Sequence, residues 1–120
     1  MFKPLQLAAV EALKQGPEWF AELNAEYRRR RELAGKIFDL IGAEYDHDSA
    51  GMFLWGRVED HTEGDVSAGQ RISDKILYEA GVFITPGFIF GRNGKDYIRI
   101  SLCAKQDVLK TAEEKIRRVL

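Results

Sequence analysis

The sequence has only one cysteine, no long apolar run and almost no net charge. Cys103 stands alone, so an intrachain disulfide is excluded. No apolar run is long enough to span a membrane, and no apolar segment follows a basic start as in a secretory signal peptide. The formal net charge of −1 provides no general attraction for nucleic acid or anionic lipid. These absences favour a cytoplasmic protein that binds neither membranes nor nucleic acid.

The rest of the composition is that of an ordinary globular domain. Of the 120 residues, 45% are hydrophobic and 31% are charged, a profile unlike that of a disordered chain. A chain of this length buries roughly two-thirds of the surface that its unfolded form exposes. One domain covering residues 1–120 is therefore predicted, without an internal linker or repeat.

The most informative stretch is residues 81–104, where two β-branched, apolar runs flank a loop rich in glycine. The second run, residues 97–103, alternates with a period of two, so Ile98 and Ile100 face the core while Arg99 lies on the other face. A guanidinium is costly to bury without a partner, and its planar N–H donors match a carboxylate. We therefore expect an anion opposite Arg99.

Hydrophobic periodicity predicts four helices and three strands. Apolar residues recur at helical spacing in four segments, and β-branched or alternating runs mark the strands. The predicted order is helix 5–13, helix 17–42, strand 52–58, helix 65–81, strand 82–85, strand 97–103 and helix 108–120. This order predicts an α+β, two-layer domain, with a small, mostly antiparallel sheet of about three strands covered by helices on one face. The other sheet face is left for a partner.

Local signals refine the ends of these elements. Pro17 suits the first turn of the long helix, Asp65 can cap the third helix, and Gly81 suits its end. Asp107 is expected near the positive end of the last helix. Asn93-Gly94 predicts a type I′ hairpin turn between the last two strands.

Taken in order, these motifs resemble the class I/II aminotransferases, the pyridoxal-phosphate enzymes of the aspartate aminotransferase fold (fold type I). The likeness covers nearly the whole chain without large gaps, and it is strongest around Arg99. The residues that carry it are Gln6 to Leu13, Tyr27 to Leu33, Gly51 to Trp55, Gly81-Val82, Pro86-Gly87, Phe90-Gly91 and Tyr97 to Ser101.

The resemblance implies that residues 1–120 are the C-terminal small domain of such an enzyme. In that family the small domain packs against a larger cofactor-binding domain, which is absent from this chain, and the parent is a homodimer of roughly 400 residues per subunit. Arg99 matches the arginine that binds the α-carboxylate of the amino acid or 2-oxo acid substrate. The loop of residues 86–91 would lie beside the cleft. No catalytic, cofactor-binding or metal-binding residue is expected in this chain.

Pyridoxal-phosphate chemistry needs a lysine for the Schiff base, and the family places that lysine shortly after a serine in the large domain. No Ser-x-x-Lys occurs here, since Ser73-Asp74-Lys75 and the segment from Ser101 to Lys105 have other spacings. We therefore expect the chain to be inactive alone. Pyridoxal phosphate would belong to the full-length parent, with none bound to this chain alone.

Two alternatives remain for Arg99 and for the domain. The arginine could form a structural ion pair with one of the 19 acidic residues. The chain could also be a stand-alone α+β binding module, whose Arg99 face recognises a small carboxylate ligand or a protein partner. Such a module would bind carboxylates without pyridoxal phosphate.

Other candidate sites are weaker. Four consecutive arginines, residues 28–31, point around most of a helix, so they are predicted to be solvated surface and not one nucleic-acid contact face. The acidic and histidine residues at 46–48 and 59–61 lack the spacing of zinc ligands. Cys103 has no base nearby in the sequence, so it is predicted to be a small core or cleft-lining residue rather than a nucleophile.

Overall fold

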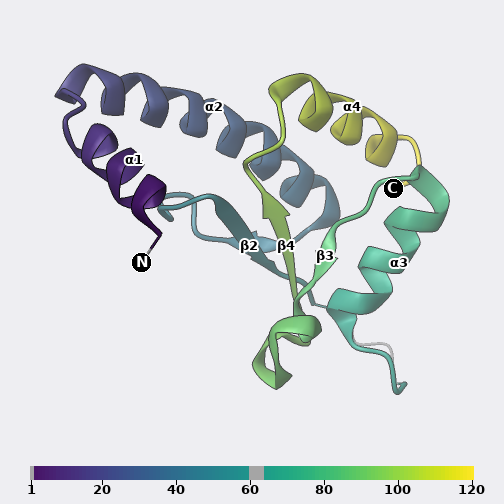
Figure 1. The fold of residues 1–120 in the computed structure, drawn as a ribbon. Coiled ribbons are helices and arrows are strands. Elements are labelled where there is room, and N and C mark those ends of the chain that lie inside the picture. Colours follow the sequence, from purple (N-terminus) through teal and green to yellow (C-terminus); the bar gives the residue numbers. More distant parts are fainter. Residues whose placement is uncertain (1, 60–63) are drawn as a thin grey trace.

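The computed structural model of the protein describes residues 2–59 and 64–120 (Figure 1). Helices dominate this part of the chain, and four short strands form its sheet. The elements in order are α1 (Lys3–Leu13), α2 (Pro17–Ile41), β1 (Glu44–Tyr45), β2 (Phe53–Arg57), α3 (Ala68–Ala80), β3 (Thr85–Pro86), the 3-10 turns η1 (Gly87–Phe90) and η2 (Arg92–Gly94), β4 (Tyr97–Ser101) and α4 (Gln106–Arg117).

The strands form one antiparallel sheet in the order β1-β2-β4-β3. Its register places Trp55 of β2 and Thr85 of β3 on either side of Arg99 in β4. The predicted α+β fold with an antiparallel sheet is confirmed, although the described residues form four strands instead of about three. The additional strand, β1, is only two residues long, and so short a polar segment carries no alternation that sequence analysis can detect.

Helices α2, α3 and α4 cover one face of this sheet. Alternate residues of the central strands, among them Leu54 and Ile98, are fully buried against Phe38 of α2, Ile76 of α3 and Ile116 of α4. The opposite face keeps partly exposed side chains, as the alternation in residues 97–103 predicted. The core therefore lies between the sheet and the helices, and the Arg99 face lies outside it.

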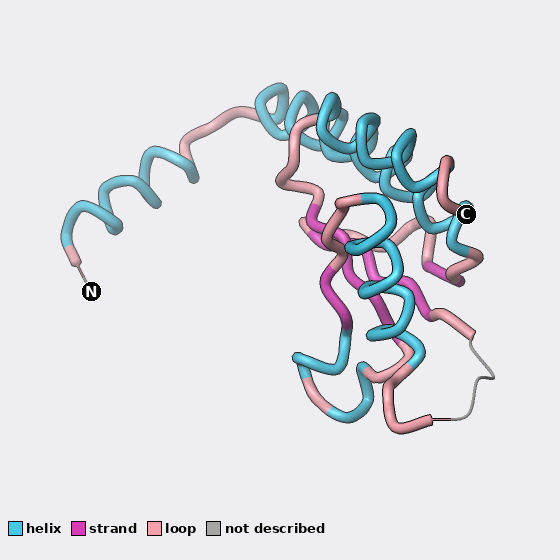
Figure 2. Tube along the Cα trace, turned by 90° about the vertical axis from the view of Figure 1, so that its right-hand side faces the viewer, coloured by secondary structure: helices cyan, strands magenta, loops and turns pink. Residues whose placement is uncertain are grey.

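The 25-residue helix α2 is only half covered by the rest of the domain. Its buried residues lie between Leu33 and Phe38, whereas Trp19, Phe20 and Leu23 are exposed on the same stripe nearer the N-terminus. Helix α1 has no buried residue and stands away from the body of the domain (Figure 2). None of the helices in residues 2–59 and 64–120 is long and apolar enough to cross a bilayer.

Three of the four predicted end signals are confirmed, and the one at Asp65 is wrong. Asp107 lies in the first turn of α4. Pro17 lies in the first turn of α2, and Gly81 ends α3 with a φ of 64°. Helix α3 is capped by Ser67 rather than Asp65, since the Ser67 side chain accepts a hydrogen bond from the backbone N–H of Gln70. The strand predicted over residues 82–85 is shorter in the structure, because the ladder of β3 begins only at Thr85.

The prediction of a type I′ turn at Asn93-Gly94 is wrong. These residues belong to the 3-10 turn η2, and Gly94 does not have the positive φ that a type I′ turn requires. The glycine serves close packing instead, because a Cβ at this position would lie 2.1 Å from the Gly87 carbonyl oxygen. Two consecutive 3-10 turns, η1 and η2, therefore replace the expected hairpin.

Candidate functional site

Strand β4 positions Arg99 on the uncovered face of the sheet. Its neighbours Ile98 and Ile100 are buried in the core, and this alternation turns the Arg99 side chain to the opposite side. Arg99 is itself half-buried. The predicted placement of this residue among core isoleucines is thus confirmed.

Three aromatic rings surround the Arg99 guanidinium. Its Cζ lies 4.2 Å from the centroid of Phe53, 4.1 Å from that of Phe90 and 5.8 Å from that of Trp55. All three separations lie within the range of cation–π attraction. Phe53 and Trp55 come from β2, whereas Phe90 ends the turn η1, and the Trp55 and Phe90 rings meet edge to face at 5.3 Å. We call Phe53, Trp55 and Phe90 the aromatic cluster.

The cluster supplies no anion. Within residues 2–59 and 64–120, no carboxylate pairs with Arg99 and no acceptor takes a hydrogen bond from its guanidinium. The structural ion pair considered from the sequence is thus not formed in this part of the chain. A guanidinium that is stacked on rings and lacks an anion is suited to a carboxylate from outside the domain.

The sequence pattern indicated Arg99 but not its aromatic neighbours. Phe53 and Trp55 share a face with it by strand alternation, so the period of β2 could have indicated them once β2 was paired with β4. Phe90 arrives from a 3-10 turn that has no comparable pattern. Cys103 lies beyond the end of β4 with an exposed thiol, and its N–H donates to Ser101 Oγ at 3.3 Å.

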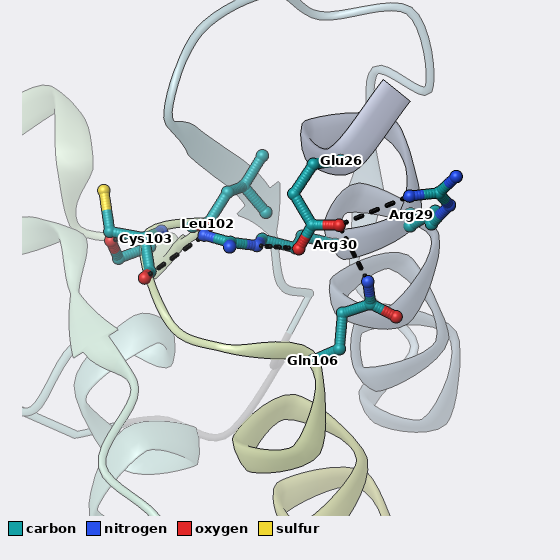
Figure 3. A network of polar contacts seen from close by, with 7 residues as sticks. Glu26, Arg29, Arg30, Leu102, Cys103 and Gln106 are labelled. Atoms are coloured by element: carbon teal, nitrogen blue, oxygen red, sulfur yellow. Dashed lines mark hydrogen bonds and ion pairs between the residues drawn. The ribbon is translucent and has the colours of Figure 1, made fainter. Parts of the chain in front are cut away.

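The arginine run contributes to internal contacts instead of one charged face. Arg30 donates from Nε to Glu26 at 2.7 Å and from Nη1 to the carbonyl oxygens of Leu102 and Cys103, at 3.1 and 3.4 Å (Figure 3). Gln106, the first residue of α4, donates to the same Glu26 carboxylate at 2.9 Å. This network joins α2 to the connection that follows β4.

The charges in this network stabilise each other. The hydrogen bond from Arg30 is the main influence that lowers the pKa of Glu26 below its ordinary value, and burial opposes it. Arg31 donates to the carbonyl oxygen of Gly51 at 3.0 Å, just before β2. Two of the four arginines thus fix chain segments on either side of the central strands.

The acidic and histidine residues do not converge. His47 packs on the ring of Tyr45 at 4.3 Å, and Asp46 accepts a hydrogen bond from the backbone N–H of Asp48 at 2.9 Å. In the part of the chain that the structure describes, no three His, Cys, Asp or Glu side chains gather as metal ligands would. The candidates Asp60 and His61 lie outside the described residues.

The Arg99 site does not fit pyridoxal phosphate itself. One guanidinium and three rings can hold a carboxylate, but they include no amine that could form a Schiff base with the cofactor's aldehyde. No step of cofactor chemistry is therefore assigned to these residues. Their chemistry is that of binding and orienting an anion.

Comparison with known proteins places this chain in one family. The family model described as "Aminotransferase class I and II" matches residues 2–116. LL-diaminopimelate aminotransferase of Natranaerobius thermophilus is 34% identical over 116 residues, which are 97% of this chain and 29% of the relative. The aromatic aminotransferase of Pyrococcus horikoshii OT3 superposes with a TM-score of 0.75 at 33% identity, over 96% of this chain and 30% of that one.

A second solved structure, apo BacF from Bacillus subtilis, has a TM-score of 0.76 at 31% identity, over 98% of this chain and 31% of its own. The chain thus spans less than a third of the length of these similar proteins. Because the family model covers nearly the whole chain, the chain belongs to the class I and II aminotransferase family.

Proposed function

We propose that residues 1–120 form the C-terminal small domain of a pyridoxal-phosphate-dependent aminotransferase, which transfers an amino group between an amino acid and a 2-oxo acid. The family match and the share of about 29% of the relative's length support this proposal. The remainder of the parent would hold pyridoxal phosphate, whose electron-withdrawing ring supplies the transamination chemistry. The parent would be a cytoplasmic homodimer.

The observation that carries the proposal is the guanidinium of Arg99, which has no acidic partner in the described residues and lies on a sheet face without helices. In this role Arg99 donates two parallel hydrogen bonds to the substrate's α-carboxylate. The clamp fixes the orientation of the substrate and takes no part in proton transfer. The aromatic cluster covers part of the guanidinium and so shields one side of the ion pair from water, which strengthens the pair.

The chain alone would be inactive. It contains no Ser-x-x-Lys, and the Arg99 site has no amine for the cofactor. The relatives act on different amino acids, since one is an LL-diaminopimelate aminotransferase and another an aromatic aminotransferase. The proposal therefore assigns the α-carboxylate of an amino acid as the group that Arg99 binds, and it does not name the substrate's side chain.

The first test is to sequence the DNA upstream of the Met1 codon. An open frame of roughly 270 codons that contains the serine-lysine signature would support the proposal, because it adds a large domain. A stop codon immediately upstream would overturn it. The chain would then be a stand-alone module that binds a small carboxylate or a protein partner through the Arg99 face.

The second test addresses Arg99 in the full-length protein. We expect Arg99→Ala to raise KM for the amino acid and to lower kcat/KM by an amount equivalent to about 2–5 kcal/mol, because one partner of a close charge pair is removed. Arg57→Ala is the matched control, since Arg57 is an exposed arginine on the neighbouring strand β2. Unchanged kinetics for Arg99→Ala would remove this residue from the site.

A further inference from the structure

The aromatic cluster holds the Arg99 guanidinium in a defined orientation. Phe53 and Phe90 are almost equally close to its Cζ, at 4.2 and 4.1 Å, yet within the described residues their rings make no contact with each other. Two rings on the same side of one carbon at this distance would touch. Phe53 and Phe90 therefore approach the guanidinium from different directions.

This arrangement leaves the hydrogen-bonding edge of the guanidinium as its open part. Aromatic faces attract the cation but accept few conventional hydrogen bonds, so the N–H donors of Arg99 remain available. A long, flexible arginine normally loses rotamer freedom when it binds a ligand. Because the rings order the side chain beforehand, that entropic cost is reduced.

The rings also remain accessible to a ligand. Phe53, Trp55 and Phe90 are 37%, 38% and 50% exposed, although they surround a charged group. A carboxylate bound at the edge of Arg99 would carry its substituent along these rings. An apolar substituent gains contact area there, whereas a second carboxylate would meet aromatic surface without a further cation from the cluster.

We propose that Phe53 and Phe90 are positioning residues, which hold the Arg99 guanidinium for a monocarboxylate that carries an apolar group. The inference rests on the proposed function and narrows its substrate class to amino acids with apolar or aromatic side chains. The two phenylalanines act through Arg99, and they come from elements that are separate in the sequence.

The test uses the 120-residue chain itself, with 3-phenylpropionate as the probe and 3-phenylpropionamide and succinate as comparison ligands. The Arg99 Nε–H resonance is assigned in ¹⁵N-edited NMR spectra by its loss in Arg99→Lys, and titration gives Kd. The variants are Phe53→Leu and Phe90→Leu. Phe88→Leu is the matched control, because Phe88 is a partly exposed ring of the same turn η1 but makes no cation–π contact with Arg99.

We expect the wild-type chain to bind 3-phenylpropionate more tightly than succinate and not to bind the amide. Phe53→Leu and Phe90→Leu should each weaken binding of 3-phenylpropionate about threefold to tenfold. Both should also move the Arg99 resonance towards that of a solvent-exposed arginine, since a ring current is lost. Phe88→Leu should change neither measurement.

Three results would overturn the inference. In the first, Phe53→Leu and Phe90→Leu leave both the Arg99 resonance and the Kd for 3-phenylpropionate unchanged, while Arg99→Lys abolishes binding. This result would contradict the role of the two phenylalanines but not the proposed role of Arg99. The second is a wild-type chain that prefers succinate or does not distinguish the acid from the amide. The third is an Arg99→Lys variant with wild-type affinity, which would contradict the proposed function as well.

Discussion

Gly69 provides a direct test of the packing between α3 and β4. A Cβ at this position would lie 2.2 Å from the carbonyl oxygen of Tyr97 and 2.8 Å from that of Lys95. Both distances are far shorter than the about 3.5 Å at which heavy atoms attract each other. The Gly69 N–H also donates to the Lys95 carbonyl at 3.0 Å, so the helix cannot withdraw without losing this bond.

The expected magnitude for Gly69→Ala follows from two opposing effects. Alanine in a helix is more favourable than glycine by up to about 1 kcal/mol. Overpacking against rigid backbone costs about 1–3 kcal/mol, and here the contacts are with two carbonyl groups that lead into β4. The free energy of unfolding should therefore fall by about 1–2 kcal/mol, whereas helix propensity alone predicts a rise.

The assay is urea unfolding followed by circular dichroism at 222 nm. A loss of this size lowers the urea midpoint by about 1 M. Gly16→Ala is the control for an added methyl group, because Gly16 has a φ of −76° and the methyl group would meet no heavy atom within 4 Å. Gly16 is the N-cap of α2, where alanine is less favourable than glycine, so this variant should lose no more than about 1 kcal/mol. The loss of stability in Gly35→Ala should lie between those of Gly16→Ala and Gly69→Ala, since the Gly35 Cβ would meet the Tyr45 hydroxyl at 2.6 Å, and a side chain can move more easily than backbone. A Gly69→Ala chain as stable as the wild type would refute the reasoning.

Three further predictions concern the core, a helix end and pH. Phe38→Ala should lower the free energy of unfolding by about 3–5 kcal/mol in the same urea assay, because Phe38 is fully buried. Ser67→Ala should cost about 1 kcal/mol by removing the cap of α3, whereas Ser67→Asp should retain most of the stability. The pKa of Glu26 is lowered in the folded chain, mainly by Arg30, so its contribution is present at neutral pH and is lost as the pH falls below about 4.5. Between pH 7 and pH 3, the Tm of Glu26→Gln should therefore fall less than that of the wild type. An equal fall in Tm for both proteins would contradict the pairing of Glu26 with Arg30.

The elements and the orientation of Arg99 were predictable because they depend on local periodicity. Alternation in β4 places Ile98 and Arg99 on opposite faces whatever the rest of the fold does. The surroundings of Arg99 depend on long-range pairing, which one sequence does not reveal. Phe90 reaches the site through the turn η1, which has no periodic pattern. The Asn93-Gly94 pair predicted a hairpin turn, but these residues form the 3-10 turn η2, in which Gly94 packs closely on Gly87.

The same limit applies to the network around Glu26. Its partner Arg30 is one helical turn away, and that pair could be expected from its spacing. Gln106 is 80 residues further along the chain, and the carbonyl oxygens of Leu102 and Cys103 belong to a connection without a regular pattern. The prediction that the arginine run is solvated surface rested on helix geometry, which does not reveal that Arg30 links α2 to the connection after β4.

Helix α2 can act mechanically as a lever. Its 25 residues correspond to a rod of about 37 Å, of which one half is fixed in the core while the other projects with Trp19 and Phe20 exposed. A tilt of the core end by about 10° would displace the projecting end by about 3 Å, given the rise of about 1.5 Å per residue. A protein surface bound to Trp19 and Phe20 would therefore be mechanically coupled to small rotations of the sheet that carries Arg99.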